Sequence, residues 1–390
     1  MTAGPGNQAP FTDLPAALVE EVLRETTTVA ERLLTSFQEV RQERESLRKQ
    51  LVDAGLVITD SSLGYPPLPT TSAADGSYAI ERLLTTDLVA ATAVAVEGLT
   101  PPSEERHWEQ PHHRTFVAAE PHGEDTATVL RAVMLGEELR LVTAAPHDLV
   151  MLDGTFTLPI IYFNQAFSKA GQSHHLHCSQ RLLEDGVIYL KAYLTILRAE
   201  RSDKHFVALP KYSTRREIGR KLGWPRPYDD RGMLTMLLNP GELTQPLGFE
   251  HPQDSQGKPT WHLNVPGFPD EEKRVARELA DDIVSALGPL RVFYYKPQQW
   301  LPAMRIEVSA SVASNSHRLA VVVQGIKHQT ATASMLEPYP IYLADRTAKA
   351  LARALPAFRQ VTTQRISERY GGDIGEVFFA MHGYRSESGR

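Results

Sequence analysis

The sequence predicts an α/β (α+β) fold in which helices flank a mixed sheet. Short apolar runs typical of strands alternate with longer amphipathic stretches typical of helices across residues 75–345. Segments rich in proline, glycine and polar residues separate them, as expected for the connections of a globular domain.

Each element follows from its apolar pattern. Strands are predicted at 72–75, 87–97, 115–120, 148–152, 205–209, 292–295, 304–309 and 319–323. Helices are predicted at 14–51, 126–145, 156–168, 186–198, 271–287 and 341–355. The order strand, strand, strand, helix, strand between Asp75 and Asp153 fits an RNase H-like arrangement.

The chain of 390 residues is longer than the ~250–300 residues that usually share a single core. We expect residues 1–13 to be disordered, and 14–70 to form a helical segment followed by a Pro-rich linker. Residues 71–390 then form the main domain, with a loop-rich insertion around 222–270. The helix at 14–51 carries a partial apolar stripe: Leu18, Val22, Leu23, Val29, Leu33, Leu34, Phe37 and Val40.

Composition limits the class of protein. The net charge of −6 has the wrong sign for a protein that coats DNA, so any nucleic-acid surface must be a local basic patch. Cys178 is the one cysteine, which excludes an internal disulfide. No apolar stretch reaches the ~18 residues of a membrane span, and the first residues do not resemble a signal peptide. We therefore expect a cytoplasmic protein.

Two Asp-Gly motifs, Ala74-Asp75-Gly76-Ser77 and Leu152-Asp153-Gly154-Thr155, follow apolar runs. A strand that ends in Asp-Gly can direct a rigid carboxylate into a cleft, because glycine lets the chain turn sharply. A hard divalent cation requires such carboxylates. Asp-Gly is also an ordinary turn dipeptide, so the motifs alone leave both interpretations open.

The helix between these motifs offers a third carboxylate. Glu137 lies in the middle of the apolar face formed by Leu130, Val133, Met134 and Leu141. A buried glutamate needs a partner or a metal ion. Glu138 lies about 100° around the helix and is the competing candidate. Glu137 can also lie at the solvent edge of the stripe.

A basic segment follows the strand at 205–209. It holds Lys211, Arg215, Arg216, Arg220, Lys221 and Arg226. Such a density of positive charge in an acidic protein suits contact with phosphates, although a solvated helix face would look the same. The run His174-His175-Leu176-His177-Cys178 is too crowded for one ion and has no second ligand pair at finger spacing.

Together these motifs resemble the NurA nucleases. The resemblance rests on ADGS at 74–77, DLVMLDGT at 148–155, the lysine in VALPKYST and the segment PYPIYLAD at 338–345. It runs from about residue 75 to 350 and implies an RNase H-like nuclease domain with acidic residues around manganese. Some members carry a tyrosine and a histidine where this chain has Glu337 and Asp345.

Carried onto this chain, the resemblance implies a two-metal deoxyribonuclease that uses two Mn²⁺ or Mg²⁺ ions. Asp75, Glu137, Asp153 and Asp345 would bind metal, and Lys211 would offset charge on the scissile phosphate. Lys211, Arg215, Arg216, Arg220 and Lys221 would contact DNA.

The resemblance also implies a 5′–3′ exonuclease and single-strand endonuclease. It would work as a homodimer with a HerA-type hexameric ATPase in DNA end resection for break repair, or in phage defence. The chain has no phosphate-binding loop of its own, which agrees with a motor supplied in trans. We expect the helix at 14–51 to contact the motor or a second copy. Two alternatives stay open: a catalytically weak adaptor of such a motor, and an RNase or phosphatase on the same core.

Overall fold

A computed structural model describes residues 14–224, 228–253, 256 and 260–389. The predicted disorder of residues 1–13 and the predicted phosphate contact Arg226 lie outside these residues. The chain divides into two compact units, residues 1–54 and residues 55–390. In the described part, no helix combines the length and the apolar character needed to cross a membrane.

The first unit is a single long helix in its described part, α1 (Ala16–Asp53), where the sequence predicted a helix at 14–51. Pro15 precedes the first turn, and the helix ends before Gly55, whose φ of +64° favours glycine. Several large apolar side chains along it are exposed: Leu18, Val22, Leu23, Val29, Leu33 and Leu34.

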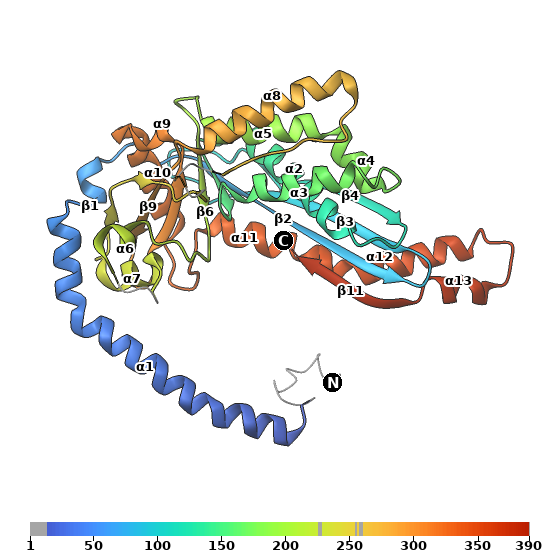
Figure 1. The fold of residues 1–390 in the computed structure, drawn as a ribbon, viewed down its shortest axis with the longest axis horizontal. Helices are drawn as coiled ribbons and strands as arrows, with labels where there is room; N and C mark the ends of the chain where they lie inside the picture. Colours follow the sequence, from blue (N-terminus) through green and yellow to red (C-terminus); the bar gives the residue numbers. More distant parts are fainter. Residues whose placement is uncertain (1–13, 225–227, 254–255, 257–259, 390) are drawn as a thin grey trace. The chain divides into compact units, whose positions relative to one another are not determined.

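The second unit is built on a mixed sheet (Figure 1). Its strand order is β1-β7-β9-β10-β6-β5-β2-β3-β4, with β11 beside β2 and β8 beside β9. The strands are β1 (Val57–Thr59), β2 (Thr71–Leu83), β3 (Asp87–Glu97), β4 (His112–Glu120), β5 (Leu149–Asp153), β6 (His205–Leu209), β7 (Glu242–Thr244), β8 (Leu247–Gly248), β9 (Arg291–Lys296), β10 (Met304–Val308) and β11 (Gly383–Gly389).

Helices cover both faces of the sheet (Figure 1). They are η1 (Asp60–Leu63), α2 (Thr126–Ala144), α3 (Leu158–Ala170), α4 (His177–Glu184), α5 (Gly186–Arg198), α6 (Glu217–Leu222), α7 (Asp230–Leu237), α8 (Asp270–Leu287), α9 (Ala310–Ala313), α10 (Ser316–Gln329), α11 (Tyr339–Ala348), α12 (Ala350–Ser367) and α13 (Ile374–Ala380). The predicted fold class, a mixed sheet flanked by helices with an N-terminal helical extension, is confirmed.

The parallel pairs β2–β5 and β5–β6 lie in the middle of the sheet. β2 pairs with β5 from Thr71 to Ala74 only, and the pairing stops at Leu152. Among the described residues, β2 then has no partner on that side until β11 joins it at Tyr78. The gap lies beside the carboxyl end of β5, which is the edge where parallel sheets bind ligands.

The two faces of β2 pack against different helices, because successive side chains of a strand point to opposite sides. A Cβ added at Gly76 would lie 2.7 Å from the Met134 side chain of α2, so this face carries α2. Ala73 belongs to the core cluster that contains Ile341 and Ala344 of α11. Asp75, two residues from Ala73, therefore points to the α11 face.

Several predicted elements differ in the structure. The strand predicted at 72–75 extends to Leu83, so Asp75-Gly76 lies inside β2 and is not a turn. The helix predicted at 341–355 is two helices, α11 and α12. The stretch between the helix predicted at 14–51 and the Pro-rich linker at 64–72 holds β1 and η1, and the segment predicted as a loop-rich insertion holds α7, β7 and β8.

The strand predicted at 319–323 is wrong, because these residues lie in the middle of helix α10. Their valines favour strands, but Leu319, Val322, Val323 and Ile326 have the spacing of one helix face and are all buried in the same core cluster. The Asn315 side chain accepts a hydrogen bond from the Arg318 N–H and caps the helix. Tertiary packing and the cap outweigh β propensity here.

Candidate metal centre

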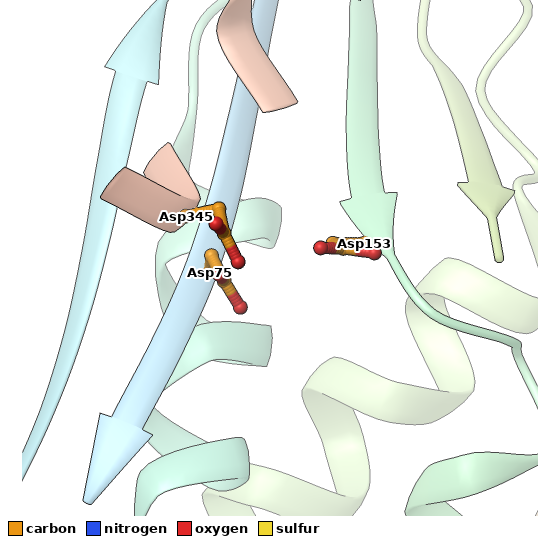
Figure 2. A group of neighbouring side chains, drawn as sticks. All are labelled: Asp75, Asp153 and Asp345. Atoms are coloured by element: carbon orange, nitrogen blue, oxygen red, sulfur yellow. The ribbon is translucent and has the colours of Figure 1, made fainter. Parts of the chain in front are cut away.

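Three aspartates from distant parts of the chain meet at the gap between β2 and β5. Asp75 comes from the middle of β2, Asp153 from the last position of β5, and Asp345 from α11 (Figure 2). One carboxylate oxygen of each lies within 4.8 Å of the other two. Asp75 is 1% exposed and Asp153 6%, and Asp345 is half-buried. Buried carboxylates this close repel one another unless a cation lies between them.

Each Asp-Gly motif positions its aspartate differently. Gly154 has a φ of +104°, so the chain turns sharply directly after Asp153, as the sequence predicted. Gly76 stays within the strand, and its N–H donates a 2.8 Å hydrogen bond to Oδ1 of Asp75. Its missing side chain makes room for α2, since an added Cβ would lie 2.7 Å from Met134 and 3.3 Å from Oε2 of Glu138.

Lys211 places its ammonium group among the carboxylates. Its Nζ lies 2.9 Å from Asp153, 3.0 Å from Glu337 and 3.5 Å from Asp345. Burial opposes the charge of the ammonium, but the attraction of Asp153 and Glu337 outweighs it and raises the pKa of Lys211 well above its usual range. Lys211 is therefore a permanent positive charge in the site. It follows β6, the parallel neighbour of β5, by two residues.

The late segment contributes two acids in different environments. Asp345 is held by Lys349, whose Nζ lies 2.8 Å from Oδ1. Burial acts to raise the pKa of Asp345, but Lys349 and Lys211 lower it overall, so this group stays ionised. Burial raises the pKa of Glu337, and Lys211 offsets only part of that effect. Glu337 is the less strongly ionised partner of the lysine.

The structure does not bring Glu137 to the aspartates. Its carboxylate accepts hydrogen bonds from Arg181 at 2.8 Å, Tyr189 at 3.0 Å and Arg140 at 3.3 Å. Glu138 instead is the α2 acid beside β2, with Oε2 against Gly76, and it is 1% exposed. Consecutive helical residues point about 100° apart, so only one of the two can face β2.

The predicted DNA-contacting residues are spread over several environments. The guanidinium of Arg216 donates to the backbone oxygens of Trp224 and Tyr228 and holds the segment together. Arg220 pairs with Glu250, and Lys221 is exposed. Trp224 is buried, so it cannot stack on a base. Arg215 lines a cavity together with Thr155, which lies two residues after Asp153.

Sequence reasoning missed a buried ion network behind Asp153. Glu307 of β10 is fully buried and accepts hydrogen bonds at 2.8 Å from the Thr155 hydroxyl and the Phe156 N–H. Arg305, 1% exposed, pairs with both Glu307 and Glu217. Two opposite charges at alternate positions of an otherwise apolar strand were the available signal, since they must share one face.

The histidine-rich segment has a structural role in its described contacts. His177 and Cys178 begin α4, and their N–H groups donate to the buried carboxylate of Glu120 at 2.9 and 2.7 Å. Glu120 thereby satisfies donors at the start of the helix, as an N-cap would. Cys178 is buried.

A mixed sheet with carboxylates gathered at the end of its parallel strands defines an oxygen-rich site suited to a hard divalent cation. The model of the NurA domain family matches residues 69–350. This is more than half of the chain, which therefore belongs to the NurA family.

Solved structures with this fold are distant in sequence. The NurA nuclease from Sulfolobus solfataricus is 12% identical, with a TM-score of 0.55 over 90% of this chain and 98% of that one. A NurA structure with manganese is 13% identical, with a TM-score of 0.53 over 89% and 99%. At these identities the likeness concerns the fold. A comparison with curated proteins found no match.

Proposed function

We propose that this protein is a metal-dependent nuclease that hydrolyses DNA. The observation that carries the proposal is the cluster of Asp75, Asp153 and Asp345 at the gap beside β5. Membership of the NurA family supports it, and a solved structure of similar fold is described as NurA with manganese. Manganese and magnesium both prefer oxygen ligands.

The residues fit such an ion. Two ligands on opposite sides of a magnesium-sized ion are about 4.2 Å apart, twice a bond of about 2.1 Å. The oxygens of the three aspartates lie within 4.8 Å of one another, and rotation of these side chains would bring them to one ion, where adjacent ligands lie about 3.0 Å apart. Asp75, Asp153 and Asp345 would hold the metal, and Glu138 is the α2 carboxylate that we propose to reach the ions from the other face of β2, through the gap beside β5. Two bound ions would supply an activated water and stabilise the leaving oxygen.

The protein's own charge acts through Lys211. Its ammonium already lies between Asp153 and Glu337 and can donate to a non-bridging oxygen of the scissile phosphate. Charge that develops on the phosphate would be offset by a group that is already positioned, so little reorganisation is needed. Glu337 keeps the lysine at this place when no substrate is bound.

We extend the proposal to substrate and partners. The enzyme would act as a 5′–3′ exonuclease and single-strand endonuclease in the cytoplasm, and Arg215, Arg220 and Lys221 would contact DNA. It would act as a homodimer with a HerA-type hexameric ATPase in DNA end resection, for break repair or phage defence. The exposed apolar positions of α1, Leu18 to Leu34, offer a surface for the motor or a second copy.

The test uses labelled linear single- and double-stranded DNA with Mn²⁺, Mg²⁺ or EDTA. Asp153→Asn should abolish cleavage. Asp60→Asn is a matched control, because Asp60 is also 6% exposed and also pairs with a lysine, Lys327, at 2.8 Å, compared with 2.9 Å for Asp153 and Lys211. Asp60→Asn should leave cleavage intact, although we expect it to lower the stability of the fold because Asp60 contacts Lys327 and Tyr295.

An adaptor without activity is the second candidate, favoured by the acids at positions 337 and 345 where some relatives carry tyrosine and histidine. If DNA stays intact with every metal, and also when a HerA-type ATPase and ATP are added, the adaptor hypothesis replaces the nuclease hypothesis. Matched RNA and phosphomonoester substrates decide between a DNA nuclease and an RNase or phosphatase on the same core.

A further inference from the structure

A cavity of about 180 Å³ is lined by residues that lie close in the sequence to Asp153 and Lys211. The segment from Pro210 to Arg215 forms one wall, and Thr155 with the pair Arg305 and Glu307 forms the rest. Thr155 lies two residues after Asp153, and Pro210 directly precedes Lys211. Two of the residues that line the cavity are thus close neighbours in the sequence of Asp153 and Lys211, which we propose to act on the scissile phosphate.

The floor of this cavity is rigid. Arg305 and Glu307 are 1% and 0% exposed, and each is fixed by several partners. Glu307 holds Thr155 and Phe156, and Arg305 reaches Glu217 at 2.6 Å. A wall that is already ordered loses little conformational entropy when a ligand binds.

Arg215 brings a poorly compensated positive charge to the cavity. Among the described residues, its ion pair is with Glu250 at 4.0 Å, the outer limit for such a pair, and Glu250 is also bound by Arg220. Burial and then the neighbouring charge of Arg305 lower the pKa of Arg215. Both effects oppose a cation at this place, the attraction of Glu217 offsets only part of them, and a bound anion would counteract them further.

The rim adds groups that suit a nucleotide. Ser213 and Thr214 supply hydroxyls, and the ring of Tyr212 is 83% exposed. An aromatic ring that stands in solvent next to a nuclease site can stack on an unpaired base. A guanidinium binds phosphate oxygens in pairs, with more geometric specificity than an ammonium group.

We propose that this cavity binds the phosphate next to the scissile one on the same DNA strand, with Arg215 as its counter-charge and Tyr212 against the attached base. The inference rests on the proposed nuclease function and adds to it a defined subsite. If this subsite exists, one of the two phosphodiester linkages next to the scissile one must carry a negative charge for normal binding.

The experiment measures cleavage with Mn²⁺ of single-stranded oligonucleotides that carry one uncharged methylphosphonate linkage, moved stepwise along the strand. In the unmodified protein, a neutral linkage at one position adjacent to the cut should raise KM about tenfold and leave kcat within about twofold. Arg215→Met should raise KM similarly on normal DNA and should lose this sensitivity. Arg277→Met, which removes an exposed arginine on α8, should behave like the unmodified protein.

The subsite is rejected if the unmodified protein tolerates a neutral linkage at both neighbouring positions, or if Arg215→Met stays equally sensitive. A second measurement separates this result from failure of the nuclease proposal. Fluorescence anisotropy in EDTA gives the Kd of the same oligonucleotides without cleavage. A loss of affinity that occurs with the neutral linkage at one position only, and that is absent in Arg215→Met, supports the subsite even if the protein cuts no DNA. Equal affinity for all positions of the neutral linkage overturns the subsite.

Discussion

The carboxylate of Glu307 accepts a 2.8 Å hydrogen bond from the backbone N–H of Phe156, three residues after Asp153 of the candidate metal centre. The same carboxylate binds the Thr155 hydroxyl and pairs with the buried Arg305. An acid on β10 thus fixes the turn that follows β5, and with it the direction of Asp153.

We expect Glu307→Gln to weaken Mn²⁺ binding and to lower kcat about tenfold, because an amide can accept the Phe156 hydrogen bond but cannot balance Arg305. Glu307→Ala should destabilise the fold by about 3–5 kcal/mol, since it leaves a buried arginine with one counter-charge fewer. Titration calorimetry with Mn²⁺ and chemical unfolding measure the two effects. Unchanged Mn²⁺ affinity in a folded Glu307→Gln protein would show that the network is structural only.

Substitutions of the two adjacent glutamates of α2 should have different effects on cleavage and on stability. Glu138→Gln should remove at least about 99% of cleavage with little loss of stability, as expected for a metal-site carboxylate. Glu137→Gln should keep most activity but lower stability by a few kcal/mol, because Arg140 and Arg181 lose their shared partner. Cleavage rate and unfolding midpoint are read on the same preparations. If Glu137→Gln instead abolished cleavage and Glu138→Gln lowered only the stability, Glu137 would be the carboxylate of the metal site.

This pair also shows how far sequence reasoning reaches. The periodicity of residues 126–145 predicted the helix and a buried glutamate in it. Both faces of α2 are covered, so periodicity could not decide whether Glu137 or Glu138 faces β2. Asp75 and Asp153 were identifiable because they follow apolar runs. Glu307 was not, because its partner Thr155 lies 152 positions away and only the order of β5, β6 and β10 brings them together.

Removal of Lys211 should act in opposite directions on metal binding and on catalysis. Lys211→Met deletes a positive charge within 3.5 Å of three carboxylates, so the site becomes more negative and Mn²⁺ should bind more tightly. Cleavage should fall about 100- to 1,000-fold, because the phosphate loses its positioned donor. Lys349→Met is the comparison, since Lys349 contacts Asp345 but is mostly exposed. Weaker Mn²⁺ binding in Lys211→Met would contradict this role.

His147 should make the protein sensitive to acid at a place away from the metal site. Its ring is fully buried, with Nε2 3.6 Å from Glu97. Burial is the main cause that lowers the pKa of His147 to about 4, and Glu97 only partly opposes it. In the unfolded chain, His147 has its ordinary pKa of about 6.5. Between about pH 6.5 and 4 it therefore binds a proton in the unfolded chain but not in the folded one. Stability is therefore full above about pH 6.5 and falls as the pH drops toward 4, by up to about 3 kcal/mol. His147→Asn should lose less stability than the unmodified protein between pH 7 and 4.5, measured by urea unfolding at each pH. Parallel losses in the two proteins would assign the acid sensitivity to other groups.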